Sequence, residues 1–122
     1  MAKRILIADD EPNIVASLEF LMEQAGYEVK AVADGNEALA AVASFRPDLV
    51  LLDVMMPGRS GYEVCEKLKG DAATRGVKVV MLSAKGRDVE VAKGIDLGAD
   101  AYVTKPFSTR ELAAKVREML GE

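Results

Sequence analysis

Three carboxylates, one hydroxyl and one lysine stand where short apolar runs of the sequence end. Asp9 and Asp10 follow the first run, Asp53 the third, Ser83 the fourth and Lys105 the fifth. Two carboxylates about 4 Å apart repel each other by roughly 4 kcal/mol at an effective dielectric constant near 20. Three of them together therefore require raised pKa values or a bound cation. Because every available ligand is an oxygen, we expect a hard cation, and Mg²⁺ is the best fit.

An acidic pocket that holds Mg²⁺ and a lysine suits phosphoryl chemistry, since the ion neutralises and orients phosphoryl oxygens. A carboxylate can itself attack phosphorus and form an aspartyl phosphate. Asp53 is our candidate for this nucleophile, because the apolar run before it is typical of a central, fully covered strand. We expect Ser83 to donate a hydrogen bond to a phosphoryl oxygen. We expect Lys105 to pair with Asp53 at rest and to contact an incoming anion.

The elements that must position these residues follow from the hydrophobic pattern. Apolar runs predict strands at 5–8, 29–32, 49–52, 77–82 and 101–103. Apolar residues at helical spacing predict a helix after each strand; the first begins near Pro12 and the last at a capping box over 108–111. This alternation predicts an α/β fold, a doubly wound parallel sheet of five strands with five helices. Ligands of such sheets bind beyond the carboxyl ends of the strands, where the candidate residues stand.

Length, charge and absent residue types exclude several classes of function. The chain of 122 residues has the size of one domain, and its net charge of −4 disfavours direct binding to nucleic acid. It has no histidine, which excludes a Ser-His-Asp triad and histidine-bound metals. It also lacks an apolar run near 18 residues and a signal peptide, so we expect a cytoplasmic protein with no membrane contact.

Other polar residues have structural interpretations. The single cysteine, Cys65, cannot form an intrachain disulfide, and we expect it to be a small buried residue of a helix. Four basic residues are expected to form a solvated face: Lys67, Lys69, Arg75 and Lys78. Asp10, which precedes Pro12, has the alternative role of a helix cap.

Four ordered stretches of the sequence carry a more specific signal: 5–11, 47–58 with Gly61, 80–84 and 98–107. Together they resemble the receiver domain of two-component response regulators along almost the whole chain. The resemblance implies a flavodoxin-like fold with strand order 2-1-3-4-5. It also implies one receiver domain over residues 1–122 with no output domain. Such a domain is a phosphorylation-dependent switch that catalyses its own Mg²⁺-dependent phosphorylation and dephosphorylation, and it is not a conventional turnover enzyme.

The resemblance gives each site residue a role. Asp53 is implied to be the phosphoacceptor and Lys105 to contact the phosphoryl group. The implied Mg²⁺ ligands are the carboxylates of Asp9, Asp10 and Asp53 and the backbone carbonyl of Met55. The Lys105–Pro106 peptide bond is implied to be cis.

The resemblance also implies how a signal enters and leaves. The phosphoryl donor is a sensor histidine kinase or a histidine phosphotransfer protein. Ser83 and Tyr102 form a switch pair, and a downstream protein target reads the surface of the fourth helix, fifth strand and fifth helix at about 87–121. Dimerisation through this surface stays open: Glu111, Lys115 and Arg117 follow the pattern of the DNA-binding branch of the family, whereas Val91 and Ala101 depart from it.

Three alternatives remain. A Mg²⁺-dependent phosphohydrolase usually has an acid–base aspartate two residues after its nucleophile, where this chain has Met55. A flavodoxin-like cofactor binder needs a glycine- or hydroxyl-rich phosphate loop after the first strand, where this chain is acidic. A receiver fold that serves as a constitutive protein-binding module has no need of the full acidic set. Turnover of a small phosphoester would favour the first, and a flavin-yellow preparation the second.

Overall fold

Strands and helices alternate along the chain in the computed structural model, which describes residues 2–84 and 88–122. The strands are β1 (Arg4–Ala8), β2 (Glu28–Val32), β3 (Leu49–Asp53), β4 (Lys78–Ala84) and β5 (Ala101–Lys105). The helices are α1 (Pro12–Gln24), α2 (Gly35–Phe45), α3 (Gly61–Gly70), α4 (Asp88–Asp96) and α5 (Thr109–Met119). Each helix follows the strand after which the hydrophobic pattern predicts it. None of the described helices is both long and apolar enough to cross a bilayer.

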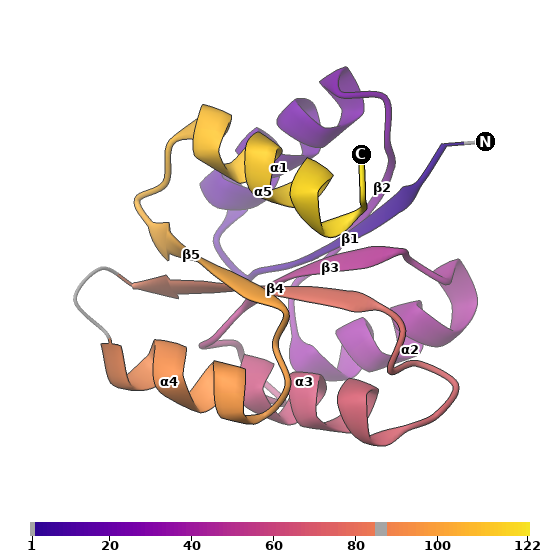
Figure 1. The fold of residues 1–122 in the computed structure, drawn as a ribbon, viewed down its shortest axis with the longest axis vertical. Helices are drawn as coiled ribbons and strands as arrows, with labels where there is room; N and C mark the ends of the chain where they lie inside the picture. Colours follow the sequence, from indigo (N-terminus) through magenta and orange to yellow (C-terminus); the bar gives the residue numbers. More distant parts are fainter. Residues whose placement is uncertain (1, 85–87) are drawn as a thin grey trace.

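The strands form one parallel sheet in the order β2-β1-β3-β4-β5. This confirms the doubly wound, flavodoxin-like fold. In Figure 1, α1 and α5 cover one face of the sheet, and α2, α3 and α4 cover the other. The order reverses at β1, because β2 lies on one side of it and β3 on the other. The carboxyl ends of β1 and β3 therefore flank the crevice where such sheets bind ligands.

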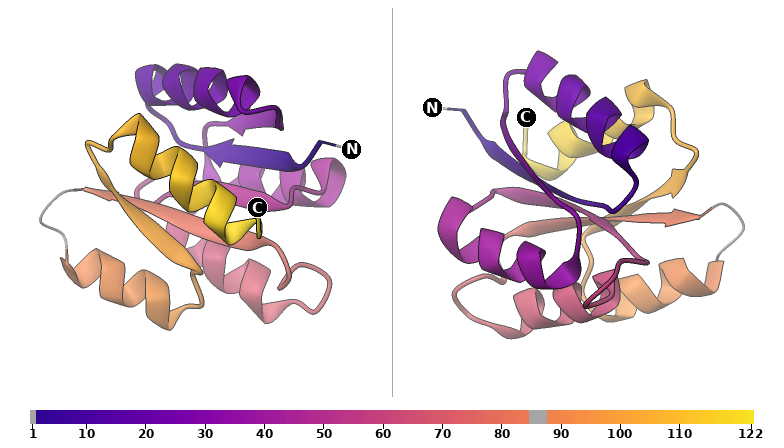
Figure 2. Two further views of the ribbon diagram at one scale, coloured as in Figure 1. Left: turned by 45° about the horizontal axis from the view of Figure 1, so that its top comes forward. Right: turned by 180° about the vertical axis from the view of Figure 1, so that it is seen from behind.

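Two apolar layers hold the helices on the sheet. Alternate residues of the central strands point to opposite faces. Ile5 and Ile7 pack with Leu18 of α1 and Leu112 of α5. Figure 2 shows from two further sides that α1 and α5 lie on the same face of the sheet. The opposite layer packs Leu6, Val50 and Leu52 against small residues of α2 and α3. All five residues of β3 are buried, so its position in the sheet is fixed from both faces.

The acidic side chains directly after β1 do not cap α1, whereas α2 and α5 each have a side-chain cap. Asp34 accepts a hydrogen bond of 2.7 Å from the amide of Glu37 and caps α2. Ser108 accepts one of 3.3 Å from the amide of Glu111, which confirms the predicted cap of α5. The residue that precedes α1 is Glu11, and no side chain caps this helix. Asp10 is therefore not the cap of α1.

Three strands continue further than the apolar runs predict. Asp53 and Lys105 are the last residues of β3 and β5, and Ser83 lies within β4. Backbone pairing continues into polar residues because the neighbouring strand is still present: Ser83 pairs with Thr104, and Ala84 pairs with Lys105. The sheet itself thus positions three candidate side chains, which the sequence places just after the strands.

Candidate functional site

Three carboxylates meet at the carboxyl ends of β1 and β3. One carboxylate oxygen from each of Asp9, Asp10 and Asp53 lies within 4.8 Å of the other two. Asp9 and Asp53 are only 1% and 7% exposed, whereas Asp10 is exposed. The structure therefore brings together the predicted acidic group: Asp53 ends β3, Asp9 is buried directly after β1, and Asp10 faces solvent.

Lys105 reaches this group from the end of β5. Its Nζ lies 2.9 Å from Asp9 Oδ2, 3.3 Å from Glu11 Oε1 and 3.4 Å from Asp53 Oδ1. The predicted pairing with Asp53 is present, but the shortest ion pair is with Asp9. Sequence reasoning did not give Glu11 a role in the site. The signal in the sequence that indicates a role for Glu11 is its position in an acidic run directly after β1.

Burial and like charge together set the protonation of Asp53. Burial, followed by the nearby charge of Asp9, raises the pKa of Asp53 from 3.8 to about 6, although Lys105 and the backbone amide of Met55 oppose the rise. Burial disfavours the ammonium of Lys105, but its hydrogen bond to Asp9 and the charges of Asp53 and Asp9 outweigh burial. The pKa of Lys105 therefore lies above its ordinary value. Lys105 stays charged, and its charge offsets only part of what burial and Asp9 cost the ionised form of Asp53.

Ser83 supplies a buried hydroxyl near the end of β4. It is 1% exposed, and its Oγ has no hydrogen-bond partner among the described residues. A buried hydroxyl without a partner loses the hydrogen bonds that it makes to water. The strand pairing places Leu82 opposite Asp53, so Ser83 stands one residue beyond that pair. This hydroxyl is available to a ligand at the acidic group.

Backbone contacts hold the loop between β3 and α3 against the end of β3. The amide of Gly61 donates a hydrogen bond of 2.9 Å to the carbonyl of Val54. Gly61 is required there, since a Cβ atom would collide with the carbonyl oxygen of Asp53. Met55 follows in this loop and is 68% exposed. Its backbone amide interacts with the Asp53 carboxylate.

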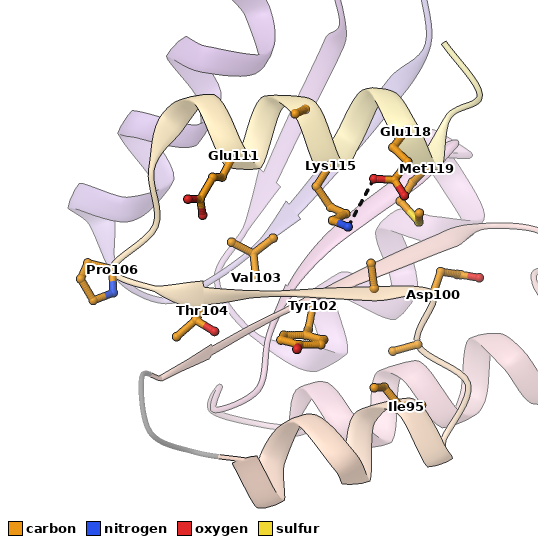
Figure 3. Close-up of a pocket in the computed structure, with 13 residues that line it drawn as sticks. Ile95, Asp100, Tyr102, Val103, Thr104, Pro106, Glu111, Lys115, Glu118 and Met119 are labelled. Atoms are coloured by element: carbon orange, nitrogen blue, oxygen red, sulfur yellow. Dashed lines mark hydrogen bonds and ion pairs between the residues drawn. The ribbon is translucent and has the colours of Figure 1, made fainter.

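The Lys105–Pro106 peptide bond is cis, as the resemblance implies. On the other side of β5, Tyr102 is 44% exposed. Figure 3 shows its ring between β5 and α4, with Glu111 and Lys115 of α5 beyond the strand. These residues line an open hollow of about 950 Å³ that is separate from the acidic group. The side chain of Val91, which the sequence places near this surface, lies outside the described residues, as do residues 85–87.

The donor set fits a hard divalent cation. Its oxygens converge closely enough to share one ion. The pKa of Asp53 is raised by burial first and by the charge of Asp9 second, and a cation in the pocket would favour the ionised form of Asp53 against both. An all-oxygen set open to solvent at Asp10 matches the preference of Mg²⁺ for carboxylates and several waters.

The fold and the site define a class of protein: an α/β domain with an acidic pocket at the switch point of its sheet and a lysine that reaches this pocket. The chain matches the family model of the response regulator receiver domain over residues 5–117. It therefore belongs to the receiver domain family of two-component response regulators.

Known proteins resemble the chain in sequence and in structure. A DNA-binding response regulator, MtrA of Mycolicibacterium smegmatis, is 46% identical over 120 residues, which are 98% of this chain and 51% of that protein. The chain thus spans about half the length of this relative. A CheY-like receiver domain protein from Methanospirillum hungatei superposes with a TM-score of 0.92 at 34% identity, over 99% of this chain and 95% of that chain. The receiver domain of a sensor histidine kinase from Pseudomonas aeruginosa, with a magnesium ion in its active-site cleft, has a TM-score of 0.91 at 26% identity over the full length of both chains.

Proposed function

We propose that this receiver domain accepts a phosphoryl group on Asp53 and acts as a switch for protein binding. The observation that carries the proposal is the position of Asp53. Its buried carboxylate lies at the end of the central strand, within 4.8 Å of two further carboxylates and 3.4 Å from the Lys105 ammonium. Family membership supports the same assignment.

The transfer step needs no acid–base residue from this chain. A carboxylate oxygen of Asp53 forms a bond to phosphorus while the nitrogen–phosphorus bond of a donor phosphohistidine breaks. The electron pair stays on the imidazole nitrogen, and that ring takes a proton from water. The donor histidine belongs to a sensor histidine kinase or a histidine phosphotransfer protein, because this chain has no histidine. Hydrolysis then returns the domain to its resting state, so it is a switch and not a conventional turnover enzyme.

Asp9, Asp10, Asp53 and the backbone carbonyl of Met55 are the groups that would hold Mg²⁺. When bound, Mg²⁺ neutralises and orients the phosphoryl oxygens. A magnesium ion in the cleft of the structurally similar Pseudomonas receiver supports the choice of metal. Lys105 leaves part of its ion pair with Asp53 and contacts the phosphoryl oxygens instead.

The switch follows from contacts that only the phosphorylated state offers. The phosphoryl group adds a charge of roughly −1.5 to −2 and three acceptor oxygens. The unpartnered Ser83 hydroxyl then has an acceptor, and a ligand shifts a population only through such differential contacts. Tyr102 turns inward behind Ser83 and changes the α4–β5–α5 surface, where a downstream protein target binds.

The remaining partners follow from charge and sequence pattern. We propose a cytoplasmic location and no direct contact of these 122 residues with DNA, given their net charge of −4. A homodimer through α4, β5 and α5 is a second use of the same surface. Lys115 and Glu118, which form a 3.3 Å ion pair there, supply both signs of charge.

Intact-mass spectrometry tests the proposal. The protein is incubated with Mg²⁺ and acetyl phosphate, and the mass is compared with that of an Asp53→Asn variant. The wild type gains one phosphoryl group, and the variant gains none. Equal gain in both proteins would show that another residue is the acceptor, and no gain in either would contradict phosphoryl acceptance. A control without Mg²⁺ reports the metal requirement separately.

A further inference from the structure

The amino end of β5 carries a pair of hydrogen bonds that involve no residue of the acidic site. Asp100 stands directly before β5, opposite Val79 of β4. Its amide donates to the Val79 carbonyl at 2.9 Å, and its Oδ2 accepts from the Val79 amide at 2.8 Å. One residue thus binds both the carbonyl and the amide of its neighbour. We call this pair of hydrogen bonds the Asp100 bracket.

Lys69 of α3 holds the bracket in place. Its Nζ donates to the same Asp100 Oδ2 at 2.8 Å and to the Val77 carbonyl, also at 2.8 Å. The Lys69 side chain is only 16% exposed, so the expectation that it belongs to a solvated face is wrong. Its stem packs on the Gly98 backbone, which explains why that turn has no room for a Cβ atom.

A second bracket of the same form lies on β3. Asp48 precedes that strand; its amide donates to the Arg4 carbonyl, and its Oδ2 accepts from the Arg4 amide, both at 2.8 Å. Asp53 is the fifth residue after Asp48, and Lys105 is the fifth residue after Asp100. Each bracket therefore fixes the start of a strand whose last residue belongs to the acidic site, about 16 Å further along.

The two strands depend on their brackets to different degrees. β3 pairs with both β1 and β4, and all its residues are buried. β5 is an edge strand that pairs only with β4, and Val103 is its one buried residue. Register is strongly specified where one face is buried and weakly specified elsewhere. A shift of β5 would withdraw Lys105 from Asp9 and Asp53 and would move Tyr102.

We propose that Asp100, supported by Lys69, is a positioning residue for phosphoryl transfer: it sets the register of β5 so that Lys105 meets the acidic site. This inference rests on the proposed function for its kinetic consequence. It requires the Asp100 bracket, and not the Asp48 bracket, to control the position of Lys105.

The test compares Asp100→Ala with Asp48→Ala, since each variant removes the same kind of hydrogen bond at the amino end of its strand. The first readout is the rate of phosphoryl uptake from acetyl phosphate with Mg²⁺ under conditions where both variants are folded. Asp100→Ala is expected to slow uptake about tenfold or more, because small misplacements of a reacting-site group have large kinetic effects. Asp48→Ala is expected to stay within about twofold of the wild type, because neighbours on both sides hold β3 in register.

The second readout is independent of activity. Backbone nuclear Overhauser contacts between β4 and β5 report the register directly, and they are expected to weaken or shift in Asp100→Ala and to persist in Asp48→Ala. Unchanged contacts in Asp100→Ala, or equal slowing in both variants, would overturn the inference. If the wild type itself takes no phosphoryl group, the proposed function fails and the strand contacts alone decide the register claim.

Two further variants cover the case in which Asp100→Ala does not fold. Asp100→Asn keeps an acceptor for the Val79 amide and is expected to retain the wild-type register, with weaker support from Lys69. Lys69→Met removes the ammonium but keeps a stem of similar shape, and it is expected to slow uptake in the same direction as Asp100→Ala. Wild-type uptake and wild-type strand contacts in Lys69→Met would remove Lys69 from the proposal.

Discussion

Asp53 is a buried carboxylate whose nearest neighbours include both a second buried carboxylate and a lysine. Burial and Asp9 raise its pKa, and Lys105 restrains the rise. In the absence of metal, the ionised form of Asp53 is therefore a source of instability at neutral pH. A cation in the pocket relieves this repulsion.

The pH dependence of stability provides a prediction at the scale of this residue. Because the pKa of Asp53 is about 6 in the folded chain and 3.8 without its surroundings, its stabilising contribution is complete below about pH 4. That contribution is lost as the pH rises through 6. With a chelator present, Asp53→Asn is expected to raise the free energy of unfolding at pH 7.5 by about 1 to 2 kcal/mol, after allowance for solvent screening.

Urea unfolding of both proteins between pH 4 and pH 8 measures this difference. The gain is expected to shrink as the pH falls below 6, and a difference that does not change with pH would contradict the raised pKa.

At the scale of single residues, the sequence predicts which residue types meet, because they stand at strand ends. It does not reveal that Asp9, and not Asp53, makes the shortest contact with Lys105. Such distances depend on how adjacent strands twist and on where long side chains find space.

The start of α3 packs against the end of β3 and so connects this helix to the acidic site. Ser60 caps this helix, and Gly61 packs directly on the backbone of Asp53. The sequence predicts a helix at this place and the strand before it, but not the Ser60 cap. It does not reveal the close approach, which arises only when β3 and α3 meet in three dimensions. The extension of β5 to Lys105 has a similar cause, because pairing with β4 overrides the end of the apolar run.

Alanine substitution at the two ends of α3 tests this coupling. Gly61→Ala is expected to lower the free energy of unfolding by at least about 2 kcal/mol, because the new methyl group collides with backbone that cannot move freely. It is also expected to weaken Mg²⁺ binding, since Asp53 must shift. Gly70→Ala is the matched control: no atom lies within 4 Å of its Cβ position, and alanine favours the helix by up to about 1 kcal/mol. Equal stability of the two variants in urea unfolding, with equal Mg²⁺ affinity, would contradict the account.

The molecule places its candidate site and the hollow beside Tyr102 on different sides of β5. Lys105 belongs to the acidic site, whereas Tyr102, three residues earlier, lines the hollow between α4 and α5. The edge strand is therefore the shortest physical connection between phosphoryl acceptance and a protein-binding surface. β5 has one buried residue and pairs on one side only, so it is held less firmly than the fully buried β3. The alternation of apolar runs predicts the layers, but the exposure of Ile95 and Tyr102 could be known only from the packing of α4.

Phosphorylation is expected to change the amide resonances of Tyr102 and its neighbours in β5. The cause is the new acceptor for Ser83 and Lys105 at the carboxyl end of the sheet. Tyr27 serves as the internal control, because its hydroxyl donates a 2.7 Å hydrogen bond to Glu122 near the opposite end of the strands. Two-dimensional NMR before and after phosphoryl transfer provides the measurement. Changes confined to residues of the acidic site would rule out transmission through β5.

The position of the phosphoryl group is the most direct test of the central claim. Borohydride reduces an aspartyl phosphate to homoserine, and peptide sequencing by mass spectrometry then locates the converted residue. We expect conversion at position 53 after incubation with Mg²⁺ and acetyl phosphate, with Asp9 and Asp10 unchanged. Conversion at position 9 or 10, or phosphoryl gain with no converted aspartate, would contradict it.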